Sequence, residues 1–428
     1  MADSRPGGIG AALAVATREA RESLLREHHG GAAPVSYLEL FFDLVYVFAI
    51  TQLSHFLLGH LTLGGVIEAG ILFLALWWAW MFTTWATNWA DPQRVPVRIM
   101  LILVMLASLF MAVALPHAFA ETGIIFAASY IAIQIGRTLF MAVIMRRTDP
   151  VNSHSMVRIA VWFAASGIAW LCGALSDDHT LRLPLWLGAL GFEYLGPLAG
   201  FFVPGLGRAD VSQWNISGAH MAERCSLFII IALGEGIVVT GGAFAAGAAS
   251  GARIVALAIA FAGSVLMWWI YFDLGAERGA KHIEQHDDPG RVARNAYTYL
   301  HMPIVLGIVV VAVADALLLS APLSPTGPAL IATLCGGALA FVIGTALFKR
   351  YSSKLGNVPF SHTLGAIGFV LLAAWGWLAP PSTMVFGAVA ASLLGFIALW
   401  EWVSFHGGWE IWTPRLGKRL GWPERPAD

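Results

Sequence analysis

The chain is poor in charged residues. Asp, Glu, Lys and Arg make up 12% of its 428 residues, whereas soluble domains carry about 25%. Apolar residues make up 58%, and the sequence holds 45 glycines and 18 tryptophans, which suits helices that pack closely in a bilayer and are anchored at its interfaces. The net charge of −1 says nothing about partners, and we expect no nucleic-acid partner. The composition favours an integral membrane protein.

Cysteine is scarce as well. The three cysteines, Cys172, Cys225 and Cys335, fall in apolar segments at unrelated spacings. This pattern predicts neither a disulfide framework nor a set of metal ligands, and it is typical of small buried apolar residues. We therefore expect no metal site and no cofactor.

The common catalytic motifs are missing from the sequence. It contains no phosphate-binding loop, no His-Glu-x-x-His, no Gly-x-Ser-x-Gly and no paired Cys-x-x-Cys, which mark nucleotide, zinc, hydrolase and redox sites respectively. No polar segment is long enough for a domain that hydrolyses nucleotides. These absences argue against an ATP-driven pump and make an enzyme the less favoured interpretation.

Long apolar runs are what the sequence has in abundance. A helix needs about 20 apolar residues to cross a bilayer, and twelve such runs predict an all-α polytopic membrane protein with about 12 transmembrane helices. Residues 1–34 contain no such run and are predicted to form a cytoplasmic tail, as are residues 409–428, which are rich in basic residues. The predicted spans are 37–58, 66–89, 97–119, 121–145, 156–176, 184–204, 221–246, 252–275, 297–320, 327–349, 360–379 and 383–405.

The basic residues favour this number of spans. With twelve spans and both termini in the cytoplasm, nearly all of the 25 Lys and Arg fall on the inner side, as the positive-inside rule requires. Only Arg182 and Arg253 lie outside, and Arg137 alone lies within a span. Miscounting by one span would reverse the side of every later loop.

The two halves of the chain echo each other in a fixed order, which indicates an internal repeat. We predict a repeat over 35–205, a linker at 206–219 and a second repeat over 220–408. Because six spans is an even number, both repeats insert the same way up, as parallel repeats. The echoes include Glu39 with Glu223 at an offset of 184, and Ser153-His154 with Ser361-His362 and Glu193 with Glu401 at an offset of 208.

Polar residues deep in two spans are candidates for an ion or solute path. Thr51, Gln52 and His55 lie about 12 to 18 Å along the helix from the carboxylates near its start. The equivalent of Thr51 in the seventh span is Glu235, flanked by glycines. A carboxylate at that depth is costly and is often functional. Pairing with Arg137 would give Glu235 a structural role instead, and helix-to-helix hydrogen bonds would do so for the others.

Charged residues near the span ends are predicted to form a structural network. Glu39 and Asp43 would suit a cation entrance, but both also lie where the helix dipole favours negative charge. They could pair with an arginine of a neighbouring span, such as Arg98 or Arg158. The predicted network comprises Glu39, Asp43, Arg137, Glu193, Glu223, Arg224 and Glu401.

Residues 38–53, Leu-Glu-Leu-Phe-Phe-Asp-Leu-Val-Tyr-Val-Phe-Ala-Ile-Thr-Gln-Leu, resemble the signature of the bacterial low temperature requirement A (LtrA) family. Residues 223–228, with 233–235, resemble that family's second landmark. The resemblance covers residues 35 to about 405. It implies a polytopic bacterial membrane protein associated with growth in the cold, and it supplies no substrate or reaction.

A fainter resemblance is to potassium channels built of six-helix repeats. Phe41-Phe42-Asp43 looks like the Phe-Ser-Asp motif in the first helix of those channels, whose Asp mainly orients helices beside the pore. Here Phe42 replaces the Ser, and Leu227 stands where the second copy would have its Asp. The comparison implies a structural role for Asp43, and a pore remains compatible with the sequence.

Three function classes fit these observations. The favoured one is a channel or secondary transporter for a small ion or solute in the bacterial inner membrane, with a path between the repeats near the first and seventh spans. The second is a membrane enzyme acting on lipid, for which Glu39 with Asp43 or His154 with Glu193 would supply the groups. The third is a scaffold or stress protein without turnover. The lipid bilayer is the expected partner, and an oligomer is compatible with the sequence.

Overall fold

The computed structural model describes residues 24–26, 35–176, 178–209, 217–273, 294–352 and 357–405. Most of the two predicted tails therefore lies outside the described residues. The chain forms two compact units, each of which is described by itself. Unit 1 comprises Met1–Phe42, Trp78–Ala114 and Ala118–Ser217, and unit 2 comprises Asp43–Trp77, Leu115–His117 and Gly218–Asp428.

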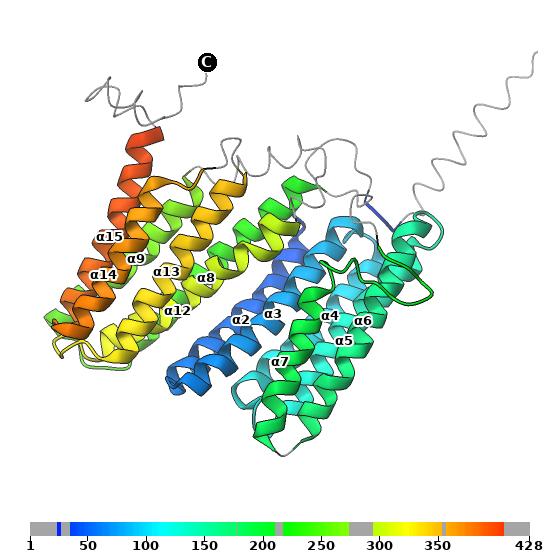
Figure 1. Cartoon of the computed structure of the whole chain (residues 1–428), viewed down its shortest axis with the longest axis horizontal. Helices are drawn as coiled ribbons and strands as arrows, with labels where there is room; N and C mark the ends of the chain where they lie inside the picture. The colour runs from blue at the N-terminus through cyan, green and yellow to red at the C-terminus, as the bar shows by residue number, and fades with distance from the viewer. Residues whose placement is uncertain are drawn as a thin grey trace, which may run out of the picture. The chain divides into compact units, whose positions relative to one another are not determined.

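Helices account for all the regular structure of the described residues apart from isolated bridges (Figure 1). This confirms the all-α prediction. Of the twelve α-helices in this part of the chain, eleven are long and apolar enough to cross a membrane, and the twelfth, α7, has 17 residues. The helices are α2 (Tyr37–Gly59), α3 (Leu63–Trp89), α4 (Val95–Ala114), α5 (Gly123–Met145), α6 (Pro150–Leu175), α7 (His179–Leu195), α8 (Gly218–Ala245), α9 (Gly251–Phe272), α12 (His301–Ser320), α13 (Pro328–Ser352), α14 (Phe360–Leu378) and α15 (Thr383–Phe405), with short helices η1 (Leu115–His117) and η3 (Arg294–Tyr299).

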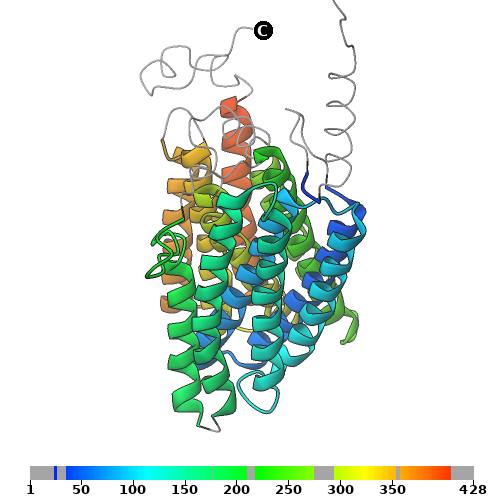
Figure 2. The same cartoon turned by 90° about the vertical axis from the view of Figure 1, so that its right-hand side faces the viewer.

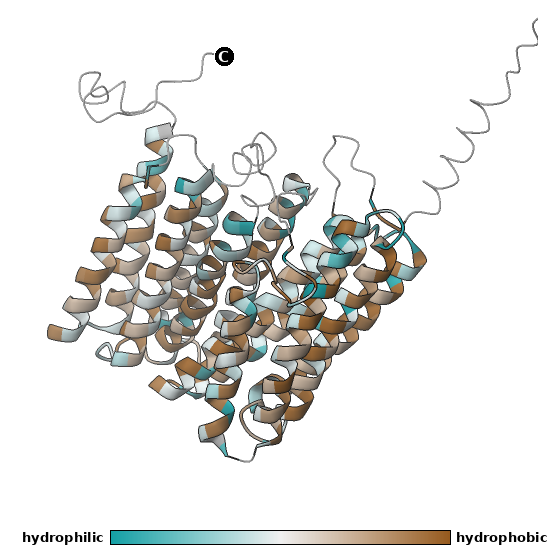
Figure 3. Cartoon of the chain, turned by 45° about the vertical axis from the view of Figure 1, so that its right-hand side comes forward, coloured by the Kyte–Doolittle hydropathy of each residue, from teal (hydrophilic) through white to brown (hydrophobic). Residues whose placement is uncertain are grey.

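The helices carry apolar side chains on their outward faces as well as inside. Brown, apolar residues run along the long helices in Figure 3. A helix that is apolar all round belongs in hydrocarbon, where its backbone groups must bond within the helix itself. The environment of these helices is therefore a lipid bilayer. On α4 alone the large exposed apolar side chains are Val95, Ile99, Ile102, Leu103, Leu106, Leu109, Phe110 and Val113.

The sixth predicted span, 184–204, is wrong at both ends. Helix α7 starts earlier, because Asp178 caps it by accepting a hydrogen bond from the backbone N–H of Thr180 (2.8 Å), a strong start signal. It stops at Leu195, before a tight turn in which Gly200 takes a left-handed φ of 62°. The apolar residues after the helix belong to this turn, where buried Phe201 packs against Phe82 of α3.

The ninth predicted span is interrupted near its start. Residues Arg294–Tyr299 form one π-helical turn, in which Leu300 N–H donates to Asn295 O (3.2 Å). Pro303 has no N–H and its ring conflicts with the carbonyl four residues earlier, so the regular ladder cannot run through this point. Helix α12 begins at His301 as a result.

In unit 1, helices α4, α5, α6 and α7 pack in chain order, each against the next (Figures 1 and 2). Their shared core is aromatic. The rings of Trp170 on α6 and Trp186 on α7 lie 5.0 Å apart, and Phe126 of α5 stacks on Trp186 at 5.6 Å. The Trp186 indole N–H donates to Trp170 O (3.0 Å), so this buried polar group is satisfied, as packing in an apolar core requires.

In unit 2, α12 is the most enclosed helix and contacts α8, α9, α13 and α15. Its closest approach is to α13. A Cβ added at Gly307 would lie 2.6 Å from both Gly337 O and Phe341 N, so glycine alone fits there. Small residues that let two backbones meet are the usual basis of helix association in membranes.

The two arginines predicted to lie on the outer side each bind carbonyl groups at the end of a neighbouring helix. Arg182 is buried in α7 and donates to Gly173 O (3.0 Å) and Ser176 O (2.8 Å) at the end of α6. Arg253, in the first turn of α9, donates to Ala243 O (2.6 Å) near the end of α8. Both guanidinium groups satisfy carbonyls that a helix end leaves without partners, and they complement the helix dipole.

Candidate functional site

Helices α2 and α8 meet in unit 2 through a buried ion pair. Arg224 donates two parallel hydrogen bonds to Asp43, from Nη1 to Oδ2 (2.7 Å) and from Nη2 to Oδ1 (2.8 Å). Both side chains are 0% exposed. A bidentate pair of this kind fixes the distance and rotation of two helices. The arginine that pairs with Asp43 is therefore neither Arg98 nor Arg158, the partners that the sequence suggested.

A second polar contact joins the same two helices further along. The hydroxyl of Thr51 on α2 lies 2.5 Å from Glu235 Oε2 on α8 and 3.0 Å from Val47 O, and its one proton is shared between these two acceptors. Glu235 is 1% exposed, and its other oxygen, Oε1, is buried with no hydrogen-bond partner among the described residues. A carboxylate oxygen without a donor in a low-dielectric site is costly. Glu235 Oε1 can therefore still accept a hydrogen bond or bind a cation.

The two contacts together set the direction of the helices. Asp43 meets Arg224 and Thr51 meets Glu235, so residue numbers rise in the same direction along both helices. We call this pair of helices, from Asp43 to Glu235, the α2–α8 contact. Of the predicted path residues, the structure brings Thr51 and Glu235 together. Gln52 is half-buried, and His55 is exposed on the outer side of α2.

Glu39 lies at the start of α2 and belongs to a capping box. Ser36 N–H donates to Glu39 Oε2 (2.9 Å), and Glu39 N–H donates back to Ser36 Oγ (3.3 Å), the reciprocal pattern that begins many helices. Arg26 completes the group by donating to Glu39 Oε2 (2.9 Å). Every interaction seen here fixes the start of the helix. Glu223, its predicted equivalent on α8, is exposed.

Arg137 and Glu193, two members of the predicted charge network, are joined inside unit 1 by a chain of hydrogen bonds. Arg137 donates to Gln134 Oε1 (2.5 Å), Gln134 donates to Tyr130 (3.0 Å), and Tyr130 donates to Glu193. Every donor in the chain points from the cation toward the carboxylate. Arg137, the partner that the sequence suggested for Glu235, thus belongs to a hydrogen-bonded chain within unit 1.

Glu193 is also bonded from α6. Ser166 donates to its Oε1 (2.6 Å), as does the Trp170 indole N–H (3.0 Å). With Tyr130 on α5, this buried carboxylate connects three helices. His154, proposed as its catalytic partner in the enzyme interpretation, is exposed, and none of the hydrogen bonds described for Glu193 involves it.

Replacing Glu193 by Gln is expected to lower the free energy of unfolding by about 1.5–3 kcal/mol, the usual contribution of hydrogen bonds to a charged group. The NH₂ group of the glutamine side chain would then face O–H or N–H donors that now donate to a carboxylate oxygen of Glu193. Chemical denaturation in mixed micelles measures the change. Glu121→Gln, at an exposed carboxylate, is the control and should be neutral. Equal stability of the two variants would contradict a role in holding the three helices together.

Glu401 on α15 is held in unit 2 by groups from two other helices. Lys349 on α13 donates to Glu401 Oε2 (2.6 Å) and to Ile270 O (2.7 Å). His362 on α14 places Nδ1 3.3 Å from Glu401 Oε1, but the two atoms are not in hydrogen-bonding geometry, and this oxygen is buried with no hydrogen-bond partner among the described residues. The lysine is therefore the stronger of the two interactions.

One buried carboxyl group, Asp315 on α12, is missing from the residues predicted from the sequence. It is the one Asp, Glu, Lys or Arg between His301 and Ser320. An ionisable residue within a membrane span is a functional candidate by default, so its position alone could have marked Asp315 as a candidate. Within the described residues, no group of three or more His, Cys, Asp and Glu is placed to hold a metal ion.

These features define a multi-pass, all-helical membrane protein in which most of the buried charged side chains are hydrogen-bonded. The chain belongs to the LtrA family, because the model of the bacterial low temperature requirement A protein (LtrA) matches residues 34–399. This confirms the resemblance seen in the sequence. The chain is also similar to the uncharacterized protein RA0937 of Rhizobium meliloti (strain 1021), with 38% identity over 381 residues, 89% of this chain and 92% of the relative. No solved structure gives a significant match.

Proposed function

We propose that the protein is a channel or secondary transporter for a small ion or solute, with its path beside the α2–α8 contact. The observation that carries the proposal is the oxygen Oε1 of Glu235, which is buried and has no hydrogen-bond partner among the described residues. An intramembrane carboxylate with spare acceptor capacity is what a permeating cation or polar solute requires.

The surroundings of Glu235 support this proposal. Gly234 precedes it, and a Cβ added there would meet nothing within 4 Å, so the backbone of α8 is uncovered one residue before the carboxylate. Asp43, by contrast, has both oxygens bonded to Arg224. We therefore assign Thr51 and Glu235 to the path and the Asp43–Arg224 pair to its wall. Gln52 and His55 remain candidate lining residues, and exposed His55 would need an opposite wall from a second copy of the chain.

The internal repeat is part of the same proposal. Thr51 and Glu235 are equivalents at the predicted offset of 184, and they are hydrogen-bonded to each other. A local two-fold relation between two parallel helices would place equivalent residues side by side in this way. Glu193 and Glu401 are also predicted equivalents, and each accepts a hydrogen bond from a side chain two helices earlier in the same half, Tyr130 and Lys349 respectively, which further supports two parallel repeats.

Glu235→Gln is expected to reduce flux through purified protein in liposomes by about 10- to 100-fold, if the lost interaction is that of a charged group, worth roughly 1.5–3 kcal/mol. Proton, sodium and potassium fluxes, read with ion-sensitive dyes, provide the measurement. Thr51→Val should also change the flux, because it removes the donor that orients Glu235.

Thr333→Val is the matched control for Thr51→Val. The Thr333 hydroxyl donates to the carbonyl of Ala329 four residues earlier (2.8 Å), as Thr51 does to Val47, but no carboxylate accepts from it in the hydrogen bonds of the described residues. Unchanged flux in Glu235→Gln with intact folding would remove Glu235 from the mechanism. We assign the protein to the bacterial inner membrane, where a link to growth in the cold would act through transport.

A further inference from the structure

Asp315 is a buried carboxyl group that the proposed path does not use. It lies in the sequence Val-Ala-Asp-Ala-Leu on α12 and is 5% exposed. No hydrogen bond or ion pair reaches it from the residues that the structure describes. Five residues, or about 7.5 Å of helix, separate it from the end of α12 at Ser320.

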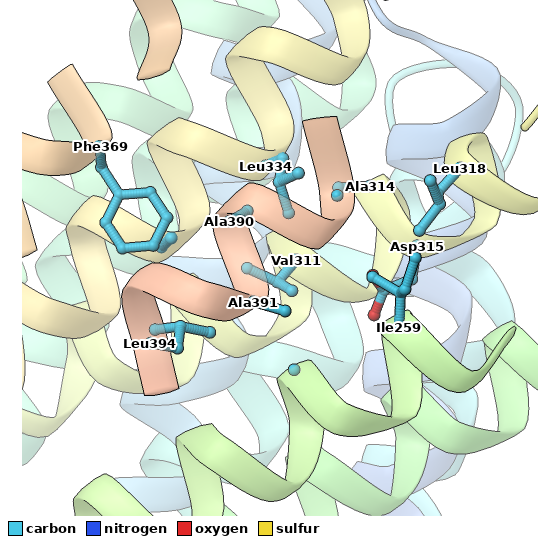
Figure 4. A pocket seen from close by; sticks show the side chains of 13 residues that line it. Ile259, Val311, Ala314, Asp315, Leu318, Leu334, Phe369, Ala390, Ala391 and Leu394 are labelled. Atoms are coloured by element: carbon cyan, nitrogen blue, oxygen red, sulfur yellow. The ribbon is translucent and has the colours of Figure 1, made fainter. Parts of the chain in front are cut away.

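A small cavity lies beside Asp315 in unit 2. Figure 4 shows the Asp315 carboxyl directed toward Ile259 of α9, among apolar side chains of the surrounding helices. The cavity has a volume of about 20 Å³, and a single water molecule needs roughly 10–15 Å³. Its lining residues come from α9, α12, α13, α14 and α15, and Asp315 is the one ionisable residue among them.

The ionisable residues on the helices packed against α12 leave Asp315 without a charged partner. Such residues include Glu235 on α8, Arg253 on α9 and Cys335 on α13, and no ion pair or hydrogen bond described for them involves Asp315. Arg253 is bonded to carbonyl oxygens at the end of α8, and Glu235 to Thr51. The lining residues contributed by α14 and α15 are apolar or glycine: Phe369, Gly387, Ala390, Ala391 and Leu394.

We propose that Asp315 and this cavity form a proton-binding site, in which the carboxyl exchanges its proton with one water molecule in the cavity. In the exchange the carboxyl O–H bond breaks and the proton passes to a lone pair of the water, leaving a carboxylate and a hydronium ion; the reverse step restores both. One carboxyl group and one water supply too few oxygens for a metal cation, which needs six or more ligands when it is Ca²⁺ or Mg²⁺.

The site lies next to the proposed path. A Cβ added at Gly236, the residue after Glu235, would lie 3.5 Å from Ala312 Cβ, and Ala312 is three residues, or about one turn, before Asp315. This part of the inference rests on the proposed function: the site would couple flux near Glu235 to proton movement, as carboxyl groups do in many membrane transporters.

Infrared spectroscopy of the full chain in nanodiscs tests the site directly. A protonated carboxyl gives a C=O band that shifts in D₂O and disappears when the group ionises. We expect a pH-dependent band that is lost in Asp315→Asn, a substitution of similar size. A spectrum unchanged by Asp315→Asn across the whole pH range would overturn the proposal.

Gly263→Ala tests the role of the cavity while keeping the carboxyl. Gly263 lines the cavity, and a Cβ added there meets nothing within 4 Å, so alanine should occupy free space without a clash. The band should persist, and its exchange with D₂O should become slower. Exchange as fast as in the parent chain would exclude water in this cavity as the proton acceptor.

Flux measurements separate this inference from the proposed function. Loss of the band in Asp315→Asn together with loss of the flux driven by a pH gradient supports both the site and the coupling. Loss of the band with unchanged flux keeps the proton site and rejects the coupling. Unchanged flux in Glu235→Gln rejects the proposed path and leaves the infrared result for Asp315 standing.

Discussion

Arg224→Met is expected to destabilise the protein by about 3–5 kcal/mol, because removing one member of a buried ion pair leaves the other charge without compensation. Asp43 would then be a fully buried carboxylate with neither of its two guanidinium hydrogen bonds. The free energy of unfolding, measured by denaturation in bicelles, should show the loss, together with a lower yield of folded protein.

The double variant Asp43→Leu with Arg224→Met distinguishes the lost charge balance from lost packing. Apolar residues of similar volume can replace a buried ion pair at little or no cost, so we expect the double variant to regain most of the stability. Arg98→Met is the control, because the exposed Arg98 side chain donates to Pro92 O (3.3 Å) and to no carboxylate in the hydrogen bonds of the described residues. If the double variant were as unstable as Arg224→Met, the ion pair would not be the cause.

Gly307→Ala is expected to disrupt the packing of α12 on α13. The added Cβ would meet the backbone of Gly337 and Phe341 at 2.6 Å, and neither atom can move without shifting a helix. Overpacking of this kind costs about 1–3 kcal/mol or more. Thermal denaturation followed by size-exclusion chromatography should show a lower midpoint.

Gly336→Ala provides a matched control on the facing helix. Gly336 is adjacent to Gly337, yet a Cβ added there meets nothing within 4 Å, so the same substitution should leave the midpoint unchanged or raise it, since alanine favours helix over glycine by roughly 1 kcal/mol. A smaller loss at Gly307 than at Gly336 would refute the close approach of α12 and α13.

The positions of the helices could largely be predicted from the sequence. In a bilayer, the backbone must bond internally and the span must match the hydrocarbon thickness, so an apolar run of about 20 residues has few alternatives to a helix. The prediction failed where apolar residues serve another purpose. Phe201 follows α7 but packs in a turn. The ninth predicted span lies within one apolar stretch, Arg294–Ser320, in which Pro303 breaks only the regular hydrogen-bond ladder.

The partners of the buried charges could not be predicted in the same way. Periodicity shows which side of a helix a residue occupies, but Asp43 and Arg224 are 181 residues apart, and several arginines were equally compatible with Asp43. The alignment of Thr51 with Glu235 came from the repeat, and the structure joins these two by a hydrogen bond. Asp315 was overlooked because it has no polar neighbour that forms a pattern with it.

The separation of Asp43 and Arg224 has a consequence for biogenesis. A ribosome adds about 5–20 residues per second, so the 181 residues between them take roughly 10 to 35 seconds to synthesise. During that interval the first membrane helix holds a carboxylate whose counter-ion has not yet been translated. The nascent chain must wait at the insertion machinery, hold Asp43 near water, or keep it protonated until α8 arrives.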